Sequence, residues 1–437
     1  MKNSHRVLPS LAAIATIVLL GCLSADPSAF ASEPPTTFKF SFGPGKPVAG
    51  YTQVTTNMIY SRELGFGFEP GGDLKATDGN ISSDKPFFFS VAVPEGNYKV
   101  TVKFGDAKAA TENTVNAELR RLMVEQVHTE PGKSETRSFI VNVRTPKIAA
   151  AGDINAGEVR LKVPRETVQE AWAWDDRLSL EFNGAHPAVA TLEIAKIDVP
   201  TVYLLGDSTV CDQPREPFNS WGQMLTRFLK PDVAVCNGAE SGDSIAPALS
   251  ARRFDKFWSQ MKSGDYLFIQ YGHNDMKSTV TNALATYTSN LRRAVEETRK
   301  HGGTPVLVTS VSRRTFNNEG KITDSFKGYT QAVREVAKEL DVPLIDLQSM
   351  AAAFYEALGP ERSHQAFATP TEGTHHNDYG SYEVAKCVVM GIKQNKLGLA
   401  KHIVDDFKDF DPAYPDPVEA FKLPKSPQVA NVTPLGS

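Results

Sequence analysis

Apolar and polar residues alternate strictly in the first part of the chain. At 38–42 and 98–104 every second residue is apolar, which is the period of strands that bury one face. Five more short apolar runs have a similar character, and they lie at 87–93, 139–143, 159–163, 178–182 and 189–197. Turn residues separate the runs, such as Pro-Glu-Gly-Asn at 94–97 and Asn-Gly at 183–184. The pattern predicts an all-β domain at 37–198, built as a β-sandwich or jelly roll.

The period of the apolar residues changes after Val199 and Pro200. Short continuous apolar runs now alternate with stretches in which apolar residues recur every three or four positions, as on one face of a helix. The runs lie at 201–205, 233–236, 266–270, 305–308 and 343–347, and the helical stretches at 221–228, 291–298, 329–340 and 384–391. This alternation predicts an α/β domain at 201–398: a doubly wound, flavodoxin-like sheet of five parallel strands with right-handed crossovers. From about residue 405 the chain is rich in proline and aperiodic, so we expect the extension at 399–437 to be either an extended strap or disordered.

The first residues have the character of a targeting segment. Basic residues precede an apolar run at 11–20, and Ala-Phe-Ala at 29–31 follows as a small-x-small cleavage site. The run is too short to span a bilayer as a mature helix. The pattern predicts a signal peptide at 1–31 and export to the periplasm or the extracellular space. An alternative is a lipoprotein box at 19–22, in which Cys22 would carry the anchoring lipid.

Composition narrows the classes of function. A chain of 437 residues with 41% apolar and 22% charged residues has room for two globular domains. A net charge of −4 offers no basic face for nucleic acid. After the predicted cleavage site only Cys211, Cys236 and Cys387 remain, too few for a disulfide framework, and the pairing of any single bridge stays open. The lack of a Cys-x-x-C motif or a His/Cys cluster argues against a metal site.

Three features of the β domain each allow a functional and a structural interpretation. Asp73, Asp78 and Asn80 could bind calcium, although Asp-Gly-Asn at 78–80 is more simply a turn. Trp172 and Trp174, expected on one face of a strand, suit stacking on sugar rings, burial in the core of the domain, or a contact between domains.

The third feature is a cluster of charged residues that belongs either to a solvated face or to a seam between domains: Glu118, Arg120, Arg121 and Glu125. Two roles therefore stay open for the β domain. It could bind sugar, or it could form a wall over the neighbouring active site.

Four loops of the α/β domain carry the candidate chemistry. Gly-Asp-Ser-Thr at 206–209 ends the first predicted strand, the segment 237–244 ends the second, and Tyr-Gly-His-Asn-Asp at 271–275 ends the third. The fourth loop, at 372–380, precedes the last helix. Parallel strands present their carboxyl ends at one edge of the sheet, so the first three loops meet there and the last helix can bring the fourth to the same place.

These loops hold the residue types that ester hydrolysis needs. A serine hydroxyl such as that of Ser208 becomes a nucleophile when an imidazole, here His375, removes its proton. A carboxylate orients the imidazole, and Glu372 lies three residues before His375. The oxyanion of the tetrahedral intermediate needs preorganised donors, which the N–H groups of Ser208 and Gly242 and the side-chain amide of Asn274 can supply.

The motifs in these four loops resemble those of a known family. Gly-Asp-Ser-Thr at 206–209, Asn-x-Ala-x-x-Gly-x-Ser at 237–244, Gly-His-Asn-Asp at 272–275 and Gly-Thr-His-His-Asn-x-Tyr-Gly at 373–380 resemble the SGNH hydrolases, also called GDSL-type esterases, and especially their rhamnogalacturonan acetylesterase group. The resemblance implies Ser208 as the nucleophile and His375 as the base. It also implies an oxyanion hole formed by Ser208, Gly242 and Asn274. The β domain is similar to galactose-binding-like modules.

One position departs from the family pattern. The family usually has an aspartate where this chain has Glu372, and the longer side chain predicts a working triad with shifted geometry. If Glu372 points elsewhere, a Ser–His dyad remains, or another carboxylate such as Asp378 serves.

Four further residues in or near these loops are candidates for substrate contact: Asp207, His273, His376 and Arg313. Three of them have a structural alternative as well. His273 suits a hydrogen bond behind the site, His376 suits packing or the substrate rim, and Arg313 suits either an acidic sugar or a surface salt bridge.

The sequence thus predicts an exported serine esterase that removes O-acetyl groups from an acetylated polysaccharide or oligosaccharide through a Ser-His-(Glu) acyl-enzyme mechanism. The resemblance favours pectic rhamnogalacturonan as the substrate. The chemistry requires no cofactor and no metal. The sequence indicates neither a nucleic-acid partner nor a membrane-spanning segment. The alternatives are a broad-specificity esterase or lipase, and a non-catalytic polysaccharide-binding protein.

Overall fold

The computed structural model describes residue 1 and residues 35–427. Apart from Met1, the predicted signal peptide at 1–31 lies outside the described residues, as do Cys22 and the end of the C-terminal extension. Within 35–427, no helix is both long and apolar enough to cross a lipid bilayer.

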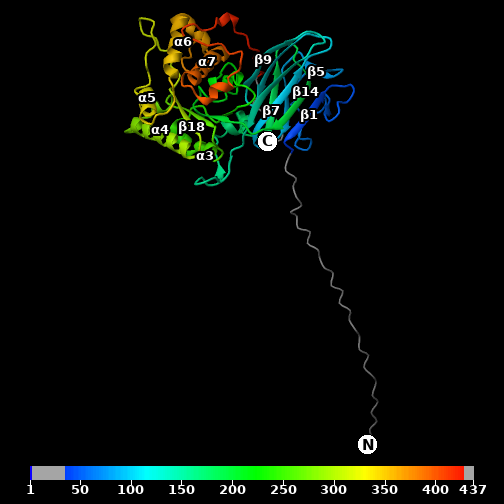
Figure 1. The fold of residues 1–437 in the computed structure, drawn as a ribbon, viewed down its shortest axis with the longest axis horizontal. Coiled ribbons are helices and arrows are strands. Elements are labelled where there is room, and N and C mark those ends of the chain that lie inside the picture. Colours follow the sequence, from blue (N-terminus) through cyan, green and yellow to red (C-terminus); the bar gives the residue numbers. More distant parts are fainter. Residues whose placement is uncertain (2–34, 428–437) are drawn as a thin grey trace. The chain divides into compact units, whose positions relative to one another are not determined.

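Two sheets form the N-terminal β domain (Figure 1). The strands of the first are β1 (Thr37–Phe42), β2 (Thr52–Val54), β4 (Leu74–Thr77), β5 (Asn80–Ser83), β7 (Gly96–Phe104), β10 (Glu135–Val143) and β14 (Ala188–Lys196). They follow the order β10-β7-β14-β1-β2, with β5 paired to β14 and β4 to β5. The strands of the second are β3 (Phe66–Phe68), β6 (Phe87–Ala92), β8 (Thr111–Ala117), β9 (Arg121–Thr129) and β13 (Arg177–Asn183), in the order β3-β6-β13-β8-β9.

Strand β7 illustrates why the alternating pattern predicted a sandwich. Its residues Tyr98, Val100, Val102 and Phe104 are fully buried, whereas Lys99 between them is exposed. The buried face packs against the second sheet in one hydrophobic core. Aromatic rings join the sheets there: Phe89 of β6 lies 5.3 Å, centroid to centroid, from both Phe40 and Phe42 of β1. The predicted β-sandwich is therefore confirmed.

Six strands of the sandwich were not predicted, and one predicted strand is absent; the six are β2, β3, β4, β5, β8 and β9. Strand β8 reads as polar, yet its Asn113 and Asn116 are buried, and their amides donate to side-chain oxygens inside the domain. The predicted strand at 159–163 is wrong: only the short ladder of β11 (Lys147–Ile148) and β12 (Gly157–Glu158) precedes it, and the chain then enters the π-helical turn η1 (Arg165–Gln169).

The two tryptophans and the Asp-Gly-Asn sequence are structural. Trp172 lies in the 3-10 turn η2 (Ala171–Ala173) rather than on a strand, and it meets Phe88 edge to face at 5.2 Å. Trp174 packs beneath the Arg144 guanidinium at 4.5 Å, and both indoles are buried in a cluster shared with the α/β domain. Sugar stacking is therefore excluded for them. Residues 78–79 form the turn between β4 and β5, and the Asn80 amide donates inward to the Gly105 carbonyl.

The C-terminal half contains the predicted sheet of five parallel strands, in the order β16-β15-β17-β18-β19. The strands are β15 (Thr201–Gly206), β16 (Ala234–Asn237), β17 (Tyr266–Gln270), β18 (Thr304–Val308) and β19 (Leu344–Ile345). The α-helices are α1 (Trp221–Leu225), α2 (Ile245–Ser250), α3 (Arg253–Trp258), α4 (Ala283–Lys300), α5 (Tyr329–Glu339), α6 (Leu347–Arg362) and α7 (Asp378–Gln394). Helices α2, α3 and α6 were not predicted.

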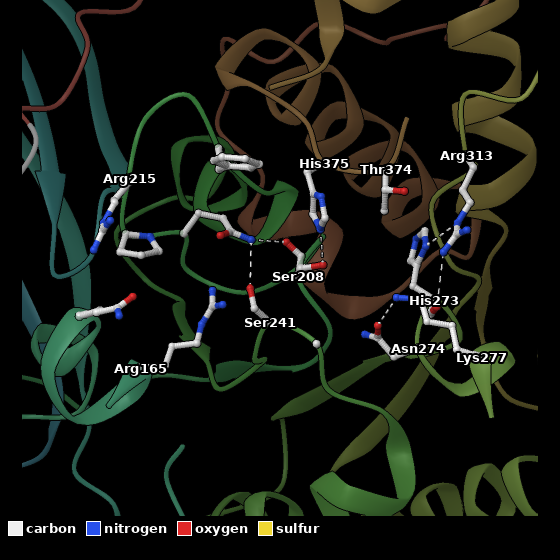
Figure 2. A pocket seen from close by; sticks show the side chains of 15 residues that line it. Arg165, Ser208, Arg215, Ser241, His273, Asn274, Lys277, Arg313, Thr374 and His375 are labelled. Carbon is white, nitrogen blue, oxygen red and sulfur yellow. Dashed lines mark hydrogen bonds between the residues drawn. The ribbon is translucent and has the colours of Figure 1, made fainter. Parts of the chain in front are cut away.

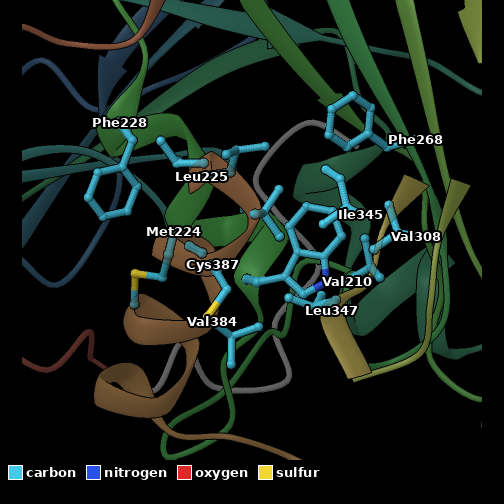
Figure 3. Close-up of a cluster of buried hydrophobic side chains, with 14 of the residues drawn as sticks. Val210, Met224, Leu225, Phe228, Phe268, Val308, Ile345, Leu347, Val384 and Cys387 are labelled. Carbon is cyan, nitrogen blue, oxygen red and sulfur yellow. The ribbon is translucent and has the colours of Figure 1, made fainter. Parts of the chain in front are cut away.

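Successive side chains of β15 enter two different cores, which is the signature of a doubly wound sheet. Val202 and Leu204 join α1, α6 and α7 on one face, and Tyr203 and Leu205 join α3, α4 and α5 on the other. Figure 3 shows the first of these cores around Met224, Ile345 and Val384. The predicted α/β fold is thus confirmed. Three thiols are buried and unbridged in these elements: Cys211, Cys236 and Cys387.

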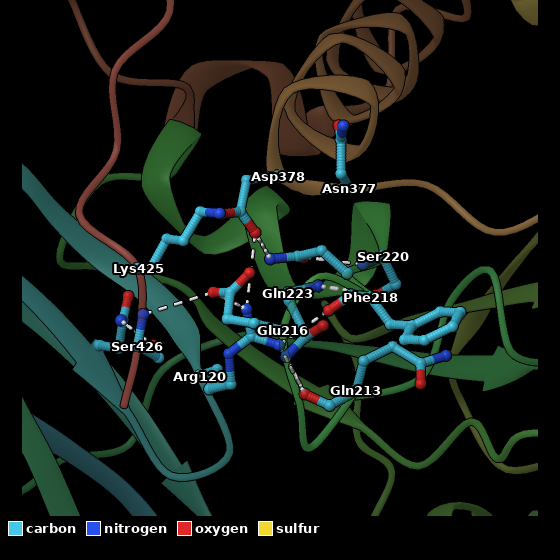
Figure 4. A network of polar contacts seen from close by, with 12 residues as sticks. Arg120, Gln213, Glu216, Phe218, Ser220, Gln223, Asn377, Asp378, Lys425 and Ser426 are labelled. Carbon is cyan, nitrogen blue, oxygen red and sulfur yellow. Dashed lines mark hydrogen bonds and ion pairs between the residues drawn. The ribbon is translucent and has the colours of Figure 1, made fainter. Parts of the chain in front are cut away.

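The charged cluster of the β domain lies at a seam against the α/β domain rather than in solvent. Arg121 is fully buried, and its Nε lies 3.3 Å from Asp212 Oδ2. Arg120 pairs with Glu216 and donates to the main-chain carbonyls of Gln213 (3.2 Å) and Phe218 (2.8 Å), as Figure 4 shows. The β domain therefore holds the loop that carries these residues.

The described part of the C-terminal extension takes the form of a strap. It begins in the 3-10 turn η6 (Gly398–His402) and continues through η7 (Val418–Ala420). The Tyr379 hydroxyl of α7 donates to the Asp416 carbonyl at 2.7 Å, and the Ser426 hydroxyl donates to Glu181 of β13 at 2.8 Å. The strap thus contacts both domains.

Candidate active site

A pocket of about 450 Å³ opens where loops from the carboxyl ends of β15, β16, β17 and β18 meet (Figure 2). The residues that line it come from both domains and from the loop before α7: Arg165, Gln169, Ser208, Gln213, Pro214, Arg215, Phe218, Ser241, Gly242, His273, Asn274, Lys277, Arg313, Thr374 and His375. The predicted meeting of four loops at one edge of the sheet is therefore present.

Ser208 stands in the tight turn that ends β15. Gly206 is required there, because a Cβ at this position would come within 2.6 Å of the Gln270 carbonyl oxygen. The buried side chain of Asp207 stabilises the turn, because its Oδ1 accepts hydrogen bonds from the N–H (3.0 Å) and the hydroxyl (2.9 Å) of Thr209. Burial raises the pKa of Asp207 to about 6, against the effect of these hydrogen bonds. The turn leaves the Ser208 side chain at the pocket surface.

The structure brings Ser208, His375 and Glu372 together. Ser208 Oγ lies 2.9 Å from His375 Nε2, the distance at which an imidazole can take the hydroxyl proton. Glu372 Oε2 lies 3.2 Å from His375 Nδ1, although Nδ1 is not aligned for a hydrogen bond. Asp378, the alternative carboxylate, instead accepts a hydrogen bond from Asn219 at 2.7 Å and faces Arg120. The contact to the imidazole is thus made by Glu372, with shifted geometry.

The Glu372 carboxylate is held in its ionised form. Burial alone would raise its pKa, but the interaction with His375 and hydrogen bonds from the N–H groups of Thr374 (2.9 Å) and Gly373 (3.0 Å) bring the pKa below the usual range. A negative charge next to Nδ1 stabilises an imidazolium that forms when Nε2 takes a proton.

Three candidate oxyanion donors face the same pocket. Gly242 has φ = +71°, a left-handed conformation that favours glycine, and no atom lies within 4 Å of where its Cβ would be. In residues 35–427, the N–H groups of Ser208 and Gly242 find no protein acceptor. The Asn274 amide donates one hydrogen to the Asp243 carbonyl at 2.8 Å, which fixes the side chain and leaves its second hydrogen for a ligand.

The four other candidates separate into two that line the pocket and two that do not. His273 lines it with a neutral ring, because burial and the nearby charge of Arg313 lower its pKa to about 3. Arg313 also lines it, and no carboxylate among the described residues lies within ion-pair distance of its guanidinium. Asp207 and His376 lie behind the pocket instead. His376 stacks on Phe367 at 4.9 Å, which corresponds to the packing role and not to the substrate rim.

Several pocket residues carried no recognisable signal in the sequence. Arg165 and Gln169 belong to η1 of the β domain, far from the four motifs in the chain. With Arg165, four basic side chains line the pocket, and no acidic residue is among the lining residues. Figure 2 shows Arg165 and Arg215 on one side of Ser208, and Lys277 and Arg313 on the other. Arg165 pairs with the buried carboxylates of Glu170 (2.6 Å) and Glu240 (3.2 Å), whereas no salt bridge engages Arg313 among the described residues, so Arg313 can face an anionic ligand.

Comparison with known proteins shows which family the chain resembles. Residues 204–381 match the GDSL-like Lipase/Acylhydrolase family. The chain is 38% identical over 217 residues to the rhamnogalacturonan acetylesterase RhgT of Bacillus subtilis, a match that covers 46% of this chain and 94% of that protein. It is 26% identical over 412 residues to the uncharacterized esterase YxiM of the same bacterium, covering 89% of this chain and 98% of YxiM. The crystal structure of YxiM aligns with 83% of this chain and 99% of the YxiM chain, at 23% sequence identity and a TM-score of 0.46.

Proposed function

Because the chain belongs to the GDSL-like lipase and acylhydrolase family, we propose that it is a serine esterase that removes O-acetyl groups from a polysaccharide. The observation that carries the proposal is the 2.9 Å contact between Ser208 Oγ and His375 Nε2, at the surface of a pocket that also presents oxyanion donors. Export of the chain, expected from the pattern at 1–31, is part of the proposal, since polymeric substrates lie outside the cell.

The reaction begins with attack of Ser208 Oγ on the acetyl carbonyl carbon, while His375 Nε2 takes the hydroxyl proton. The charge of Glu372 stabilises the imidazolium, and the donors of Ser208, Gly242 and Asn274 stabilise the oxyanion. His375 then returns the proton to the departing sugar oxygen, which leaves an acetyl group on Ser208. A water molecule, deprotonated by His375, attacks this acetyl-enzyme and releases acetate.

The charges of the pocket support an acidic substrate, pectic rhamnogalacturonan. Galacturonate units of that polymer carry carboxylates, and the pocket presents basic side chains on both sides of Ser208. The relative RhgT is a rhamnogalacturonan acetylesterase, which supports the same substrate class. A lipase function is less favoured, since a charged lining suits lipid chains poorly.

Acetate release tests the proposal. Wild type and Ser208→Ala are assayed on acetylated pectic rhamnogalacturonan and on acetylated xylan, whose backbone is neutral. We expect release from the pectic substrate that is abolished in the variant. Equal acetate release from both polymers would be consistent with the serine mechanism and would contradict a preference for an acidic substrate. Activity that survives in Ser208→Ala would refute the mechanism, and tight glycan binding without any acetate release would support a non-catalytic binding protein.

A further inference from the structure

A segment of the β domain lies against the loop that carries Gly242. We name residues 162–170 the wall segment and residues 240–244 the oxyanion loop. The wall segment contributes Arg165 and Gln169 to the pocket lining, and the oxyanion loop contributes Ser241 and Gly242 (Figure 2). Residues more than seventy positions apart in the sequence therefore form adjacent parts of one pocket.

Lys162 makes the direct contact between the two segments. Its Nζ donates a hydrogen bond of 2.8 Å to the main-chain carbonyl oxygen of Ser241. This carbonyl and the N–H of Gly242 belong to the same peptide group. In a trans peptide the C=O and N–H bonds point in opposite directions, so a donor that holds the carbonyl also sets the direction of the N–H.

The ammonium charge adds a second effect. A cation at the carbonyl oxygen draws electron density through the conjugated peptide and makes the N–H at its other end a stronger donor. The Gly242 N–H has no protein acceptor among residues 35–427 and belongs to a residue that lines the pocket. The contact from Lys162 thus both orients and polarises a group that is free to bind an oxyanion.

Contacts with buried carboxylates keep Lys162 at this position, and its own side chain is 38% exposed. The fully buried carboxylate of Glu166 accepts a hydrogen bond from the main-chain N–H of Lys162 (2.8 Å) and another from the Arg253 guanidinium (2.9 Å). Arg253 Nε in turn lies 3.2 Å from Asp243 of the oxyanion loop. Carboxylates of that loop also face the Lys162 ammonium, with Glu240 at 3.6 Å and Asp243 at 3.7 Å. The wall segment and the oxyanion loop are therefore joined by several charged contacts.

We propose that Lys162 is a positioning residue for the oxyanion hole: it fixes and polarises the Ser241–Gly242 peptide, so that the β domain completes the catalytic pocket. The proposal rests on the proposed esterase function. It assigns to the β domain the role of a wall over the active site, one of the two roles that its sequence left open.

The test measures hydrolysis of p-nitrophenyl acetate by the full chain and by Lys162→Met, which keeps the length of the side chain and removes its charge. Loss of one oxyanion donor typically lowers kcat about 100-fold or more, so misdirecting a donor that remains should lower kcat about tenfold, with KM changed less than about twofold. Lys162→Arg retains a cationic donor and should keep most of the activity. The matched control is Lys196→Met, because Lys196 also donates to a main-chain carbonyl, that of Glu95 at 3.0 Å, outside the pocket lining.

A transition-state analogue separates positioning from a general structural effect. An alkylboronic acid forms a B–O bond with Ser208 Oγ, and the resulting tetrahedral anion places an oxygen where the oxyanion would lie. Its inhibition constant should rise about tenfold in Lys162→Met, in parallel with the loss of kcat, while the melting temperature stays close to that of the control. A fall in kcat without this rise, or unchanged kcat, would overturn the proposal.

Failure of the proposed function gives a different result. If Ser208→Ala keeps wild-type activity on p-nitrophenyl acetate, the serine mechanism fails, and the role of Lys162 fails with it. If Ser208→Ala is inactive and Lys162→Met behaves as wild type, only the positioning role is refuted.

Discussion

Replacing Glu372 by glutamine tests how much the third member of the triad contributes. Glutamine keeps an oxygen that can accept hydrogen bonds from the N–H groups of Gly373 and Thr374, now 3.0 and 2.9 Å from Glu372 Oε1. The loop conformation should therefore persist. The substitution removes the negative charge that faces His375 Nδ1.

The size of the effect follows from the geometry. Two unit charges 3.2 Å apart attract by about 5 kcal/mol at an effective dielectric constant of about 20. The Glu372 and His375 side chains are 25% and 31% exposed, and solvent screening together with the unaligned Nδ1 reduces this to about 2 kcal/mol. A barrier higher by that amount lowers kcat about 30-fold. A well-aligned triad aspartate gives a much larger loss, about 10⁴-fold, on conversion to the amide.

The assay compares kcat and KM of wild type and Glu372→Gln on p-nitrophenyl acetate, with melting temperatures as a check on folding. Glu339→Gln is the control, since Glu339 pairs with Arg292 on the surface and not with the pocket. A loss of less than about threefold would remove Glu372 from the triad. A loss above about 1000-fold would show that the carboxylate is fully aligned during catalysis and that our reading of the shifted geometry is wrong.

Three further predictions concern the oxyanion hole, the charge of the pocket and a buried carboxyl group. Asn274→Ala should lower kcat about 100-fold with little change in KM, and unchanged kcat would exclude its amide from the oxyanion hole. Arg313→Gln should raise KM several-fold on acetylated rhamnogalacturonan and leave p-nitrophenyl acetate unaffected, with the surface variant Arg292→Gln as control; an equal change on both substrates would argue against charge recognition. Burial raises the pKa of Asp275 to about 7, so the native state holds this proton more tightly than the unfolded chain does, and the associated stability is present at low pH and lost as pH rises through 7. Between pH 5 and pH 8, thermal and urea unfolding should therefore show wild type losing about 2 kcal/mol more stability than Asp275→Asn, and parallel curves would contradict this.

The sequence by itself determined the elements whose residues face a core on a regular period. Strand β17 was predicted at its observed bounds. In β7, from Tyr98 on, fully buried side chains alternate with exposed or half-buried ones, because a strand that buries one face repeats every second residue. The positions of the first three motif loops were also predictable from the sequence, because each of these loops follows a predicted strand. Ser208, Gly242 and Asn274 follow directly after strands, so the parallel sheet alone brings them to one edge.

Only the tertiary structure decided which side chains meet across distant segments. Strand β8 escaped prediction because most of its buried residues are polar and Asn116 donates to Glu181 of β13, a kind of pairing that hydrophobic periodicity does not detect. The burial of His376 and the unaligned contact of Glu372 depend on how the loop before α7 packs, not on motif spacing. The contact of Lys162 with the oxyanion loop has the same origin. Side-chain contacts between distant segments arise from the packing of whole domains, whereas periodicity records only which face of each element is buried.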